Sequence, residues 1–405
     1  MEKKYLLAFL VVLALIVTAC SGGPVGGPAS SAETATEASG GGGEAGTGSE
    51  GAERAAEEVS QAEDAGPELA PELTVYNWID YIDEEILEAY EEEFGVKIIY
   101  DNFASNEDLL AKLQAGATGY DVIFPSDYMV SQMIELEMLA EIDADTIPNF
   151  ANIGDEFKNV PFDPNNAHCV PYQWGTTGLA YRAGHEFFAE NPPDSWAYLF
   201  EPELLEQYAG EGINALNDQR ELMAAALVYL GYDGNSTNEA EIAEARDLII
   251  QAKPYWKTFN SEDYDDTLLI PDEVVFSQAW SGDAANAYWN TYDEEAEDGN
   301  WYYAIPEEGA VKWLDNICVT ASTERYDTAL HFINYLLDAE NGAAITNFTY
   351  YASPNEAAQE FILEEILEDP SIYPPPEVQE MLFWLEEVGD AVFLYDEAWT
   401  VIKGQ

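Results

Sequence analysis

The fold is indicated by the stretch Tyr120-Asp121-Val122-Ile123-Phe124-Pro125-Ser126-Asp127-Tyr128. Residues 120–124 are mostly apolar and predict a short strand, which ends at Pro125 because proline lacks the N–H that a strand ladder needs. Residues 127–137 follow as a predicted helix. A strand that runs directly into a helix is the repeating unit of α/β folds.

The residues before this stretch repeat the same alternation. Strands are predicted at 73–77 and 96–100, and helices at 83–94 and 106–115. This alternation predicts an α/β fold with a mostly parallel sheet that is covered on both faces. Ligands in open α/β sheets bind beyond the carboxyl ends of the strands, so the residues that follow each strand are the first candidates for a binding site.

Aromatic residues and carboxylates occur together in short clusters, two of which follow predicted strands. The clusters are Trp78-Ile79-Asp80-Tyr81, Ser126-Asp127-Tyr128, Asp218-Gln219-Arg220-Glu221, Trp280-Ser281-Gly282-Asp283, Trp313-Leu314-Asp315 and Tyr350-Tyr351. Carboxylates bind ammonium groups, and aromatic faces accept both methylene chains and positive charge. If folding gathers the clusters in one cleft, they suit a flexible ligand that carries several amines.

Most of these residues also have a purely structural explanation. A single tryptophan in a globular chain is usually part of the core. Asp218 and Glu221 could instead mark the start of a helix, since acids favour helix N-termini. Asp80 is either a direct amine partner or a solvated neighbour of the site, and Asp127 and Arg220 are expected on the surface.

The chain is strongly acidic, with 79 Asp and Glu against 14 Lys and Arg and a formal net charge of -65. Such a charge opposes nucleic acids and anionic lipid surfaces, so no nucleic-acid partner is expected. It favours cationic ligands at long range, although an acidic surface suited to a salty or acidic habitat explains most of it. The 10 Trp, 25 Tyr and 17 Phe indicate a globular body. The three histidines lack companions at metal-ligand spacing, so neither a metal nor a cofactor is expected.

The N-terminus is predicted to be an export signal. A basic start precedes an apolar run over residues 5–17, which is too short for a spanning helix, and residues 1–19 are therefore interpreted as a signal peptide. The sequence Val17-Thr18-Ala19-Cys20 resembles the lipobox of bacterial lipoproteins, with Val where Leu is commoner. That resemblance implies that Cys20 becomes the lipidated first residue and anchors the protein outside the cytoplasmic membrane. An ordinary secretory signal is the alternative.

Residues 20–71 are predicted to be a disordered, acidic tether that is rich in Gly, Ser and Ala. They include no aromatic residue, so they cannot bury enough apolar surface to offset the entropy of ordering.

Cys169 and Cys318 both lie in apolar, strand-like runs. An oxidising environment outside the cytoplasm permits a disulfide between them, and two buried free thiols are the alternative.

From Leu73 to its end, the chain resembles the bacterial spermidine/putrescine-binding proteins of polyamine ABC importers. The motifs that carry the resemblance, in the family's order, are Tyr76-Asn77-Trp78-Ile79-Asp80-Tyr81, Ser105-Asn106-Glu107, the stretch 120–128, Pro161-Phe162-Asp163-Pro164-Asn165-Asn166, Pro171-Tyr172-Gln173-Trp174-Gly175-Thr176, Trp313-Leu314-Asp315-Asn316 and Ser353-Pro354-Asn355. Several ordered motifs over the whole body are far more specific than any one of them.

The resemblance implies a two-lobed, type II periplasmic-binding-protein-like fold in which crossing strands form the hinge. Lobe 1 would comprise residues 72–173 plus 314–351, and lobe 2 residues 174–313 plus 352–405. Ligand bound between the lobes would stabilise the closed form.

The resemblance also implies how the candidate residues contact a polyamine. The implied contacts are aromatic for Trp78, Tyr81, Tyr128, Trp280, Trp313 and Tyr351, carboxylate for Asp218, Glu221, Asp283 and Asp315, polar for Ser126, and undecided for Asp80. Two departures put the preferred polyamine in doubt. Ile79 stands where spermidine-type members often have a hydroxyl residue, and Leu385 where they often have a glutamine.

These observations predict an extracytoplasmic, membrane-anchored monomer that captures spermidine or putrescine. Delivery to an ABC permease driven by a cytoplasmic ATPase follows from the resemblance. No bond is made or broken in such a role, so the protein is expected not to be an enzyme. The alternatives are a binding protein for another small solute, such as a sugar, and a secreted carbohydrate-active enzyme, since paired carboxylates flanked by Trp also suit a glycosidase.

Overall fold

The computed structural model describes residues 68–117 and 119–404, and residues 65–405 form one compact unit. The predicted signal peptide, the predicted lipidation site Cys20 and most of the predicted tether lie outside the described residues. Within the described part, no helix has the length and apolar character needed to cross a membrane.

A large mixed sheet organises this unit. Its strands are β1 (Glu72–Trp78), β2 (Lys97–Phe103), β3 (Val122–Ile123), β4 (Cys169–Arg182), β5 (Ile213–Ala215), β6 (Thr258–Phe259), β7 (Phe276–Trp280), β8 (Trp301–Ala304), β9 (Ala310–Val319) and β10 (Leu382–Trp384). They lie in the order β2-β1-β3-β9-β4-β7-β5-β6, with β10 beside β9 and β8 beside β4.

The helices that cover the sheet are α2 (Glu84–Phe94), α3 (Asn106–Gln114), α4 (Asp127–Glu135), α5 (Glu186–Glu190), α6 (Ala197–Phe200), α7 (Pro202–Leu205), α8 (Gln219–Tyr229), α9 (Glu239–Ala252), α10 (Ser281–Asn290), α11 (Tyr326–Leu336), α12 (Ala339–Thr349), α13 (Glu364–Leu367), α14 (Pro376–Gln379) and α15 (Val392–Lys403). The first three helices, α2, α3 and α4, begin and end close to the ranges 83–94, 106–115 and 127–137 that the sequence predicts. Side chains cap several of them: Asp83 accepts the N–H of Glu85 at the start of α2, and Ser105 accepts that of Asp108 at the start of α3.

The first three strands pair in parallel, as the alternation predicts, with β1 between β2 and β3. The prediction of a mostly parallel sheet also holds for β5, which pairs in parallel with β6 and β7, and for β10 beside β9, but it is wrong for the middle of the sheet. Strand β9 is antiparallel to both β3 and β4, and β4 is antiparallel to β7 and β8. Local alternation of strands and helices cannot reveal this, because the direction of a strand that returns from late in the chain is set by its distant partners.

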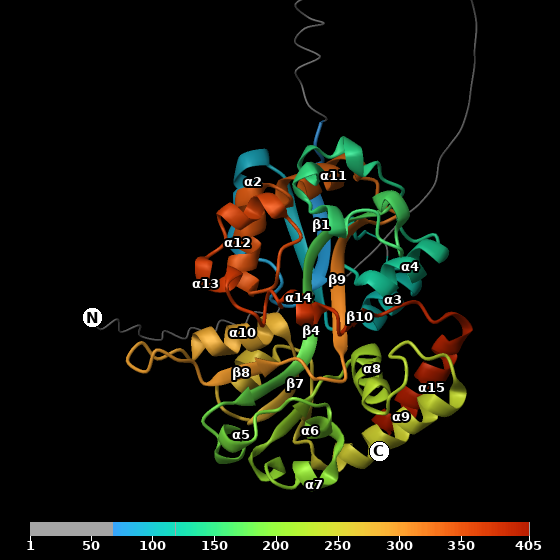
Figure 1. The fold of residues 1–405 in the computed structure, drawn as a ribbon. Helices are drawn as coiled ribbons and strands as arrows, with labels where there is room; N and C mark the ends of the chain where they lie inside the picture. The colour runs from blue at the N-terminus through green and yellow to red at the C-terminus, as the bar shows by residue number, and fades with distance from the viewer. Residues whose placement is uncertain (1–67, 118, 405) are drawn as a thin grey trace, which may run out of the picture. The chain divides into compact units, whose positions relative to one another are not determined.

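Strands β4 and β9 run side by side and join the two parts of the sheet (Figure 1). Residues 169–176 of β4 pair with β9, and residues 177–182 pair with β7 and β8. Cys169 and Cys318 are opposite each other in the β4–β9 register and form a disulfide between positions 149 residues apart in sequence. These strands are the crossing connections that the predicted fold requires.

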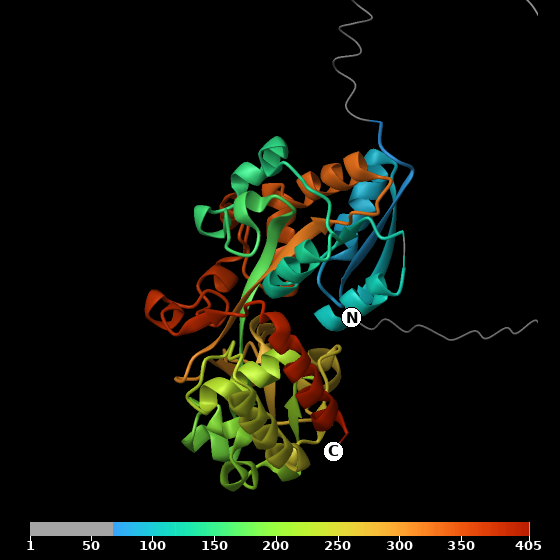
Figure 2. The same ribbon diagram turned by 90° about the vertical axis from the view of Figure 1, so that its right-hand side faces the viewer.

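Buried side chains form two large hydrophobic cores. The first core includes Leu73, Phe124 and Phe332, and the second includes Phe188 and Tyr395. Figure 2 shows α9 and α15, which contribute to the second core, packed against each other. Several buried residues of the segment 352–372 pack with the first core, whereas those of 388–402 pack with the second. The lobe boundaries given above stay a prediction.

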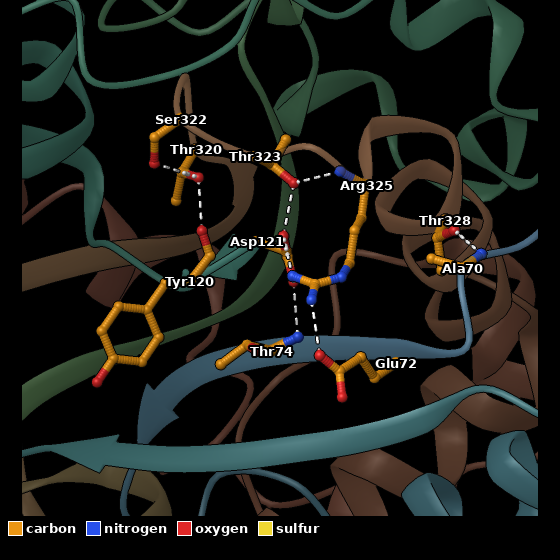
Figure 3. Close-up of polar contacts among 10 residues, drawn as sticks. All are labelled: Ala70, Glu72, Thr74, Tyr120, Asp121, Thr320, Ser322, Thr323, Arg325 and Thr328. Carbon is orange, nitrogen blue, oxygen red and sulfur yellow. Dashed lines mark hydrogen bonds and ion pairs between the residues drawn. The ribbon is translucent and has the colours of Figure 1, made fainter. Parts of the chain in front are cut away.

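An ion pair between the buried Asp121 and the partly exposed Arg325 helps to fasten the start of β1 to the segment after β9 (Figure 3). Asp121 is 1% exposed and accepts hydrogen bonds from the backbone N–H of Thr74 at 2.7 Å and from Oγ1 of Thr323 at 2.6 Å. Arg325 reaches Oδ2 of Asp121 at 3.3 Å with Nη1, and Oε1 of Glu72 at 2.7 Å with Nη2. Because an unpaired carboxylate at this depth is costly, the arginine compensates it and holds β1 in place.

Candidate functional site

One cavity of about 290 Å³ collects side chains from distant parts of the chain. Every predicted binding residue lines it, namely Trp78, Asp80, Tyr81, Ser126, Tyr128, Asp218, Glu221, Trp280, Asp283, Trp313, Asp315 and Tyr351. Folding therefore brings the predicted clusters together. Their contacts with a ligand stay a prediction.

Several of these side chains lie at, or just after, the carboxyl ends of strands. Trp78 is the last residue of β1, and Ser126 follows β3 as the residue that precedes α4. Trp280 ends β7, and Asp283 lies in the first turn of α10. The cavity thus lies where carboxyl ends of strands give way to helices, as expected for an α/β sheet.

Asp315 is at the centre of a preformed hydrogen-bond network. Its side chain is 5% exposed and accepts hydrogen bonds from the hydroxyl of Tyr81 at 2.7 Å and from Oγ of Ser126 at 2.6 Å. The amide of Asn106 donates to the same Ser126 Oγ at 3.0 Å and so orients the hydroxyl. Burial raises the pKa of Asp315 to about 7. Among the described residues Asp315 has no ion-pair partner.

The start of helix α8 presents a second acid to the cavity. Asp218 caps the helix by accepting the backbone N–H of Glu221 at 3.1 Å, so the helix-start interpretation of this pair is confirmed alongside its place in the cavity. Glu221 is 6% exposed, and its Oε2 has no hydrogen-bond partner among the described residues. Burial and the neighbouring Asp218 raise the pKa of Glu221 well above its usual range. A buried acid with an unpaired oxygen facing a cavity is a place for a donor from a ligand.

Aromatic rings form the walls between these acids. The hydroxyl of Tyr351 donates to Oδ1 of Asp283 at 2.7 Å. The ring of Tyr351 meets those of Trp313 and Tyr81 edge to face, with centroids 5.1 and 5.4 Å apart. The rings of Trp78 and Trp280 are also perpendicular, at 6.1 Å. Such edge-to-face packing fixes the orientation of the rings.

Two glycines make room for these rings. A Cβ at Gly175 would lie 2.6 Å from Cζ2 of Trp313, and a Cβ at Gly282 would lie 2.5 Å from Cδ1 of Tyr351. Both distances are shorter than real carbon contacts, so any larger residue would displace the ring.

A further group of acids also lines the cavity, and sequence reasoning missed it. Asp263, Asp265 and Asp266 lie there with the predicted residue Asp80. Burial raises the pKa of Asp265 to about 6, and burial together with Asp266 raises the pKa of Asp80. The three acids do not follow a strand that was predicted, although the run Glu262-Asp263-Tyr264-Asp265-Asp266 has the same aromatic and acidic composition as the predicted clusters.

The cavity lining also contains residues that were not predicted to bind a ligand. Ile79 and Leu385, the two departures from the spermidine-type pattern, both line the cavity with apolar side chains. The lining residues that were not predicted also include Phe103, Ala104, Asn106, Asp127, Ser261, Asn286, Asn290, Phe348 and Thr349.

The prediction that Asp127 and Arg220 lie on the surface is wrong. Asp127 is 1% exposed and accepts hydrogen bonds from the backbone N–H groups of Tyr128 at 2.7 Å and Leu314 at 3.3 Å. Arg220 is 3% exposed and donates to the carbonyl of Glu386 at 2.9 Å. The partners from distant segments offset part of the cost of burial. Burial still raises the pKa of Asp127 well above its usual range, and Nε of Arg220 has no hydrogen-bond partner among the described residues.

Comparisons with known proteins identify the family to which this chain belongs. Residues 85–374 match the model of the bacterial extracellular solute-binding protein family. The chain is 34% identical over 338 residues to the putrescine-binding periplasmic protein SpuD of Pseudomonas aeruginosa. This alignment covers 82% of this chain and 91% of that protein. The chain is also 34% identical over 339 residues to the putrescine-binding periplasmic protein PotF of Escherichia coli, with the same shares of both chains.

Solved structures show the same fold. The spermidine/putrescine ABC transporter substrate-binding protein PotD of Streptococcus pneumoniae matches with a TM-score of 0.66 and 30% identity, over 83% of this chain and 99% of that one. The predicted two-lobed, type II periplasmic-binding-protein fold is thereby confirmed. From its family match, its relatives and its fold, this chain belongs to the bacterial extracellular solute-binding proteins.

Proposed function

We propose that this protein binds a polyamine, spermidine or putrescine, in the acidic and aromatic cavity and delivers it to an ABC permease. One observation carries the proposal. Asp315, Glu221 and Asp283 face the cavity, and none of them forms an ion pair within the described part of the chain. Buried acids without a cation are unfavourable, so a polycationic ligand would relieve a cost that the protein already carries.

The magnitudes are sufficient for tight binding. A hydrogen bond between an ammonium group and a carboxylate contributes about 1.5–3 kcal/mol net. A desolvated cation–π contact contributes about 2 kcal/mol. Two or three of each, reduced by desolvation and ordering, reach the roughly 8 kcal/mol that corresponds to micromolar affinity. The rings of Trp78, Trp280 and Trp313 would pack along the methylene chain, and the carboxylates would select for amines.

The ligand would be held without covalent chemistry. Tyr81 and Tyr128 line the cavity and belong to the first core. The cavity residues of α8 and β7 lie on elements whose buried side chains contribute to the second core. A ligand that contacts both sides stabilises the arrangement in which they are close together. The lobes with the boundaries predicted above would therefore close on the ligand around β4 and β9.

The relatives support the choice of ligand, because SpuD and PotF are both named putrescine-binding periplasmic proteins. We extend the proposal to a monomer that is anchored outside the cytoplasmic membrane through a lipidated Cys20 and that serves a permease driven by a cytoplasmic ATPase. Mass spectrometry of the membrane-bound protein tests the anchor. A Cys20→Ser variant should be released from the membrane, and full retention would contradict lipid anchoring.

Thermal-shift measurements with spermidine, putrescine, spermine, maltose and glycine betaine test the ligand class. A ligand that binds only the native state raises the melting temperature by mass action. The amines should raise it, and maltose and glycine betaine should leave it unchanged. A shift with maltose and none with any amine would replace the proposal by sugar binding.

A further inference from the structure

Lys312 is a partly buried cation on the crossing strand β9. Three aromatic rings lie around its ammonium group: the ring centroids of Trp174, Trp384 and Phe157 are 4.5, 5.0 and 5.6 Å from Nζ. Within residues 68–117 and 119–404, Lys312 forms no ion pair. The faces of the rings attract the cation and offset part of the hydration that it loses. Lys312 and these three rings are called the Lys312 cage below.

The Lys312 cage lies behind the ligand cavity. Trp313 and Asp315, two residues apart on β9, both line the cavity. Side chains alternate between the two faces of a strand, so Lys312 lies on the opposite face of β9. The described residues that line the cavity include none of the four residues of the cage. The cage therefore makes no direct contact with the cavity.

The rings of the Lys312 cage are held by different parts of the molecule. Phe157 and Trp174 belong to the first core. Trp384 is the last residue of β10 and lies opposite Lys312 in the register of β10 with β9. The carbonyl of Trp384 accepts a hydrogen bond at 2.8 Å from Nδ2 of Asn235, which lies between α8 and α9. Since the buried residues of both helices contribute to the second core, the cage connects the two cores.

Lys312 lies where the crossing strands separate. It pairs with Thr176, the last residue of β4 that pairs with β9. The next residue, Thr177, pairs instead with Trp280 of β7. When two lobes rotate about a hinge, a few residues at the ends of elements absorb the change in backbone conformation. A rotation at this point would change the distance between Trp384 and the rings of the first core.

The cage is formed in a structure whose two sides also meet across the cavity. The hydroxyl of Tyr351, which belongs to the first core, donates to Oδ1 of Asp283 on α10 at 2.7 Å. The ring of Trp78 at the end of β1 lies 6.1 Å from that of Trp280 at the end of β7. The cage and these contacts lie on opposite sides of the crossing strands and occur together in one closed arrangement.

We propose that the Lys312 cage is a latch behind the hinge, which favours the closed arrangement and thereby raises ligand affinity without touching the ligand. Its effect on affinity rests on the proposed function, whereas its effect on the conformation does not. Lys312 is thus a positioning residue. The apparent affinity of a ligand that binds the closed protein is proportional to the fraction of protein that is closed before binding. Loss of the cage lowers this fraction, and affinity falls with it.

Lys312→Met tests the latch, because it keeps a side chain of similar length and removes the charge. Spin labels on Glu92→Cys of α2 and Glu203→Cys of α7 report the distance between the two sides. Both positions are exposed, and the buried residues of α2 and α7 belong to the first and the second core. Without ligand, Lys312→Met should shift the label distances towards longer values. Calorimetry should show spermidine affinity falling about fivefold, as expected for the loss of partly exposed cation–π contacts.

Three further variants separate the latch from a general effect of charge or fold. Lys312→Arg keeps a cation in the cage and should keep wild-type distances and affinity. Trp384→Leu removes the ring on β10 and should act in the same direction as Lys312→Met. The matched control is Lys403→Met, whose Nζ lies 5.5 and 5.7 Å from the ring centroids of Phe259 and Trp399. Both of these rings pack against the second core, so this control should leave the label distances unchanged.

The outcomes decide the latch separately from the proposed function. Label distances that stay the same or become shorter in folded Lys312→Met overturn the latch, and Trp384→Leu decides in the same way if Lys312→Met does not fold. A lower unfolding free energy with wild-type distances and affinity also overturns it, because the cage would then only stabilise the fold. A wild-type protein that binds no amine overturns the proposed function, while the label distances without ligand still decide the latch.

Discussion

The hydroxyl of Tyr81 donates a hydrogen bond at 2.7 Å to Oδ2 of Asp315, which lies 234 residues later in the chain. This contact joins the loop after β1 to the crossing strand β9. It orients a carboxylate that lines the cavity. A carboxylate that the protein itself holds in place lowers the ordering cost of binding.

Asp315→Asn should weaken spermidine binding by about 10-fold to 150-fold, the range that corresponds to the loss of one charge-assisted hydrogen bond. The asparagine keeps the shape of the side chain and removes its charge, so the variant should fold. Calorimetry measures the loss, and circular dichroism checks the fold. The control is Asp145→Asn at an exposed position, which changes the net charge equally. Unchanged affinity in Asp315→Asn would refute the assigned role.

Tyr81→Phe should have a smaller effect, because it removes one donor to Asp315 while Ser126 still donates to the other oxygen at 2.6 Å. One neutral donor contributes about 0.5–1.5 kcal/mol, so affinity should fall roughly 2-fold to 13-fold. Calorimetry on both variants and on their combination measures how strongly the two sites depend on each other. Fully additive losses would show that the hydroxyl does not act through Asp315.

Lowering the pH should weaken ligand binding, whereas it should increase the contribution of the buried acids to the unfolding free energy. Burial raises the pKa of Asp315 to about 7 and the pKa of Asp265 to about 6. A cationic ligand binds the ionised acids, so affinity should fall as the pH is lowered below about 7, by up to about tenfold per pH unit for each proton taken up. Calorimetry at a series of pH values and constant salt measures this dependence.

Protonation of the same buried acids, Asp315 and Asp265, stabilises the protein without ligand against unfolding. Between about pH 4 and pH 7 the native state holds protons on these acids that the unfolded chain has released, so the contribution of these acids to the unfolding free energy falls as the pH rises. Thermal unfolding without ligand measures this trend. Asp315→Asn should flatten it, and a pH dependence identical to that of the wild type would contradict the raised pKa of Asp315.

Gly282→Ala should weaken ligand binding through Tyr351. The added Cβ would lie 2.5 Å from the ring, so the ring must move, and its hydroxyl would lose the 2.7 Å hydrogen bond to Asp283. Affinity measured by calorimetry should fall about tenfold. Gly184→Ala is the matched control, because nothing lies within 4 Å of its added Cβ and its φ is not positive. Equal affinities for the two variants would contradict the packing argument.

Arg325→Met should destabilise the fold without changing ligand affinity. It removes the cation that compensates the buried Asp121. Arg325 is itself 27% exposed, so the loss should be at most the roughly 3 kcal/mol expected when a buried pair loses one partner. Urea unfolding should show the loss, and Arg246→Met on α9, where the arginine pairs with the neighbouring Asp247, provides the control. The network around Asp121 does not line the cavity, so calorimetry of the folded variant should give wild-type affinity. If the binding free energy changed by as much as the unfolding free energy, the network around Asp121 would be shown to position the residues of the cavity.

Local elements were predictable because their hydrogen bonds and caps are local. The helices α2 and α3 begin after Asp83 and Ser105, whose side chains cap neighbouring N–H groups, and α2 ends at Gly95 with φ of 69°. The candidate acids and rings were predictable for a different reason. Their chemistry depends on residue type, and Trp78 directly follows the strand that the apolar pattern predicts at 73–77.

The burial of Asp127 and Arg220 was not predictable from their neighbours in sequence. Asp127 is satisfied in part by the N–H of Leu314, and Arg220 by the carbonyl of Glu386. A charged residue is expected on the surface unless hydrogen-bond partners from distant parts of the chain are known. The acids at 263, 265 and 266 were missed because only folding brings that segment beside Asp80.

The α/β class, the first three strand–helix units, the family resemblance and the kinds of side chain available to a cation could all be predicted from the sequence. Those properties depend on residue type and on short-range periodicity. The antiparallel pairing of β9 with β3, the hydrogen bond from Tyr81 to Asp315 and the bond from Arg220 to the carbonyl of Glu386 became known only from the folded structure. These relationships depend on contacts between residues far apart in the chain, and no local pattern encodes the distance or direction of such a contact.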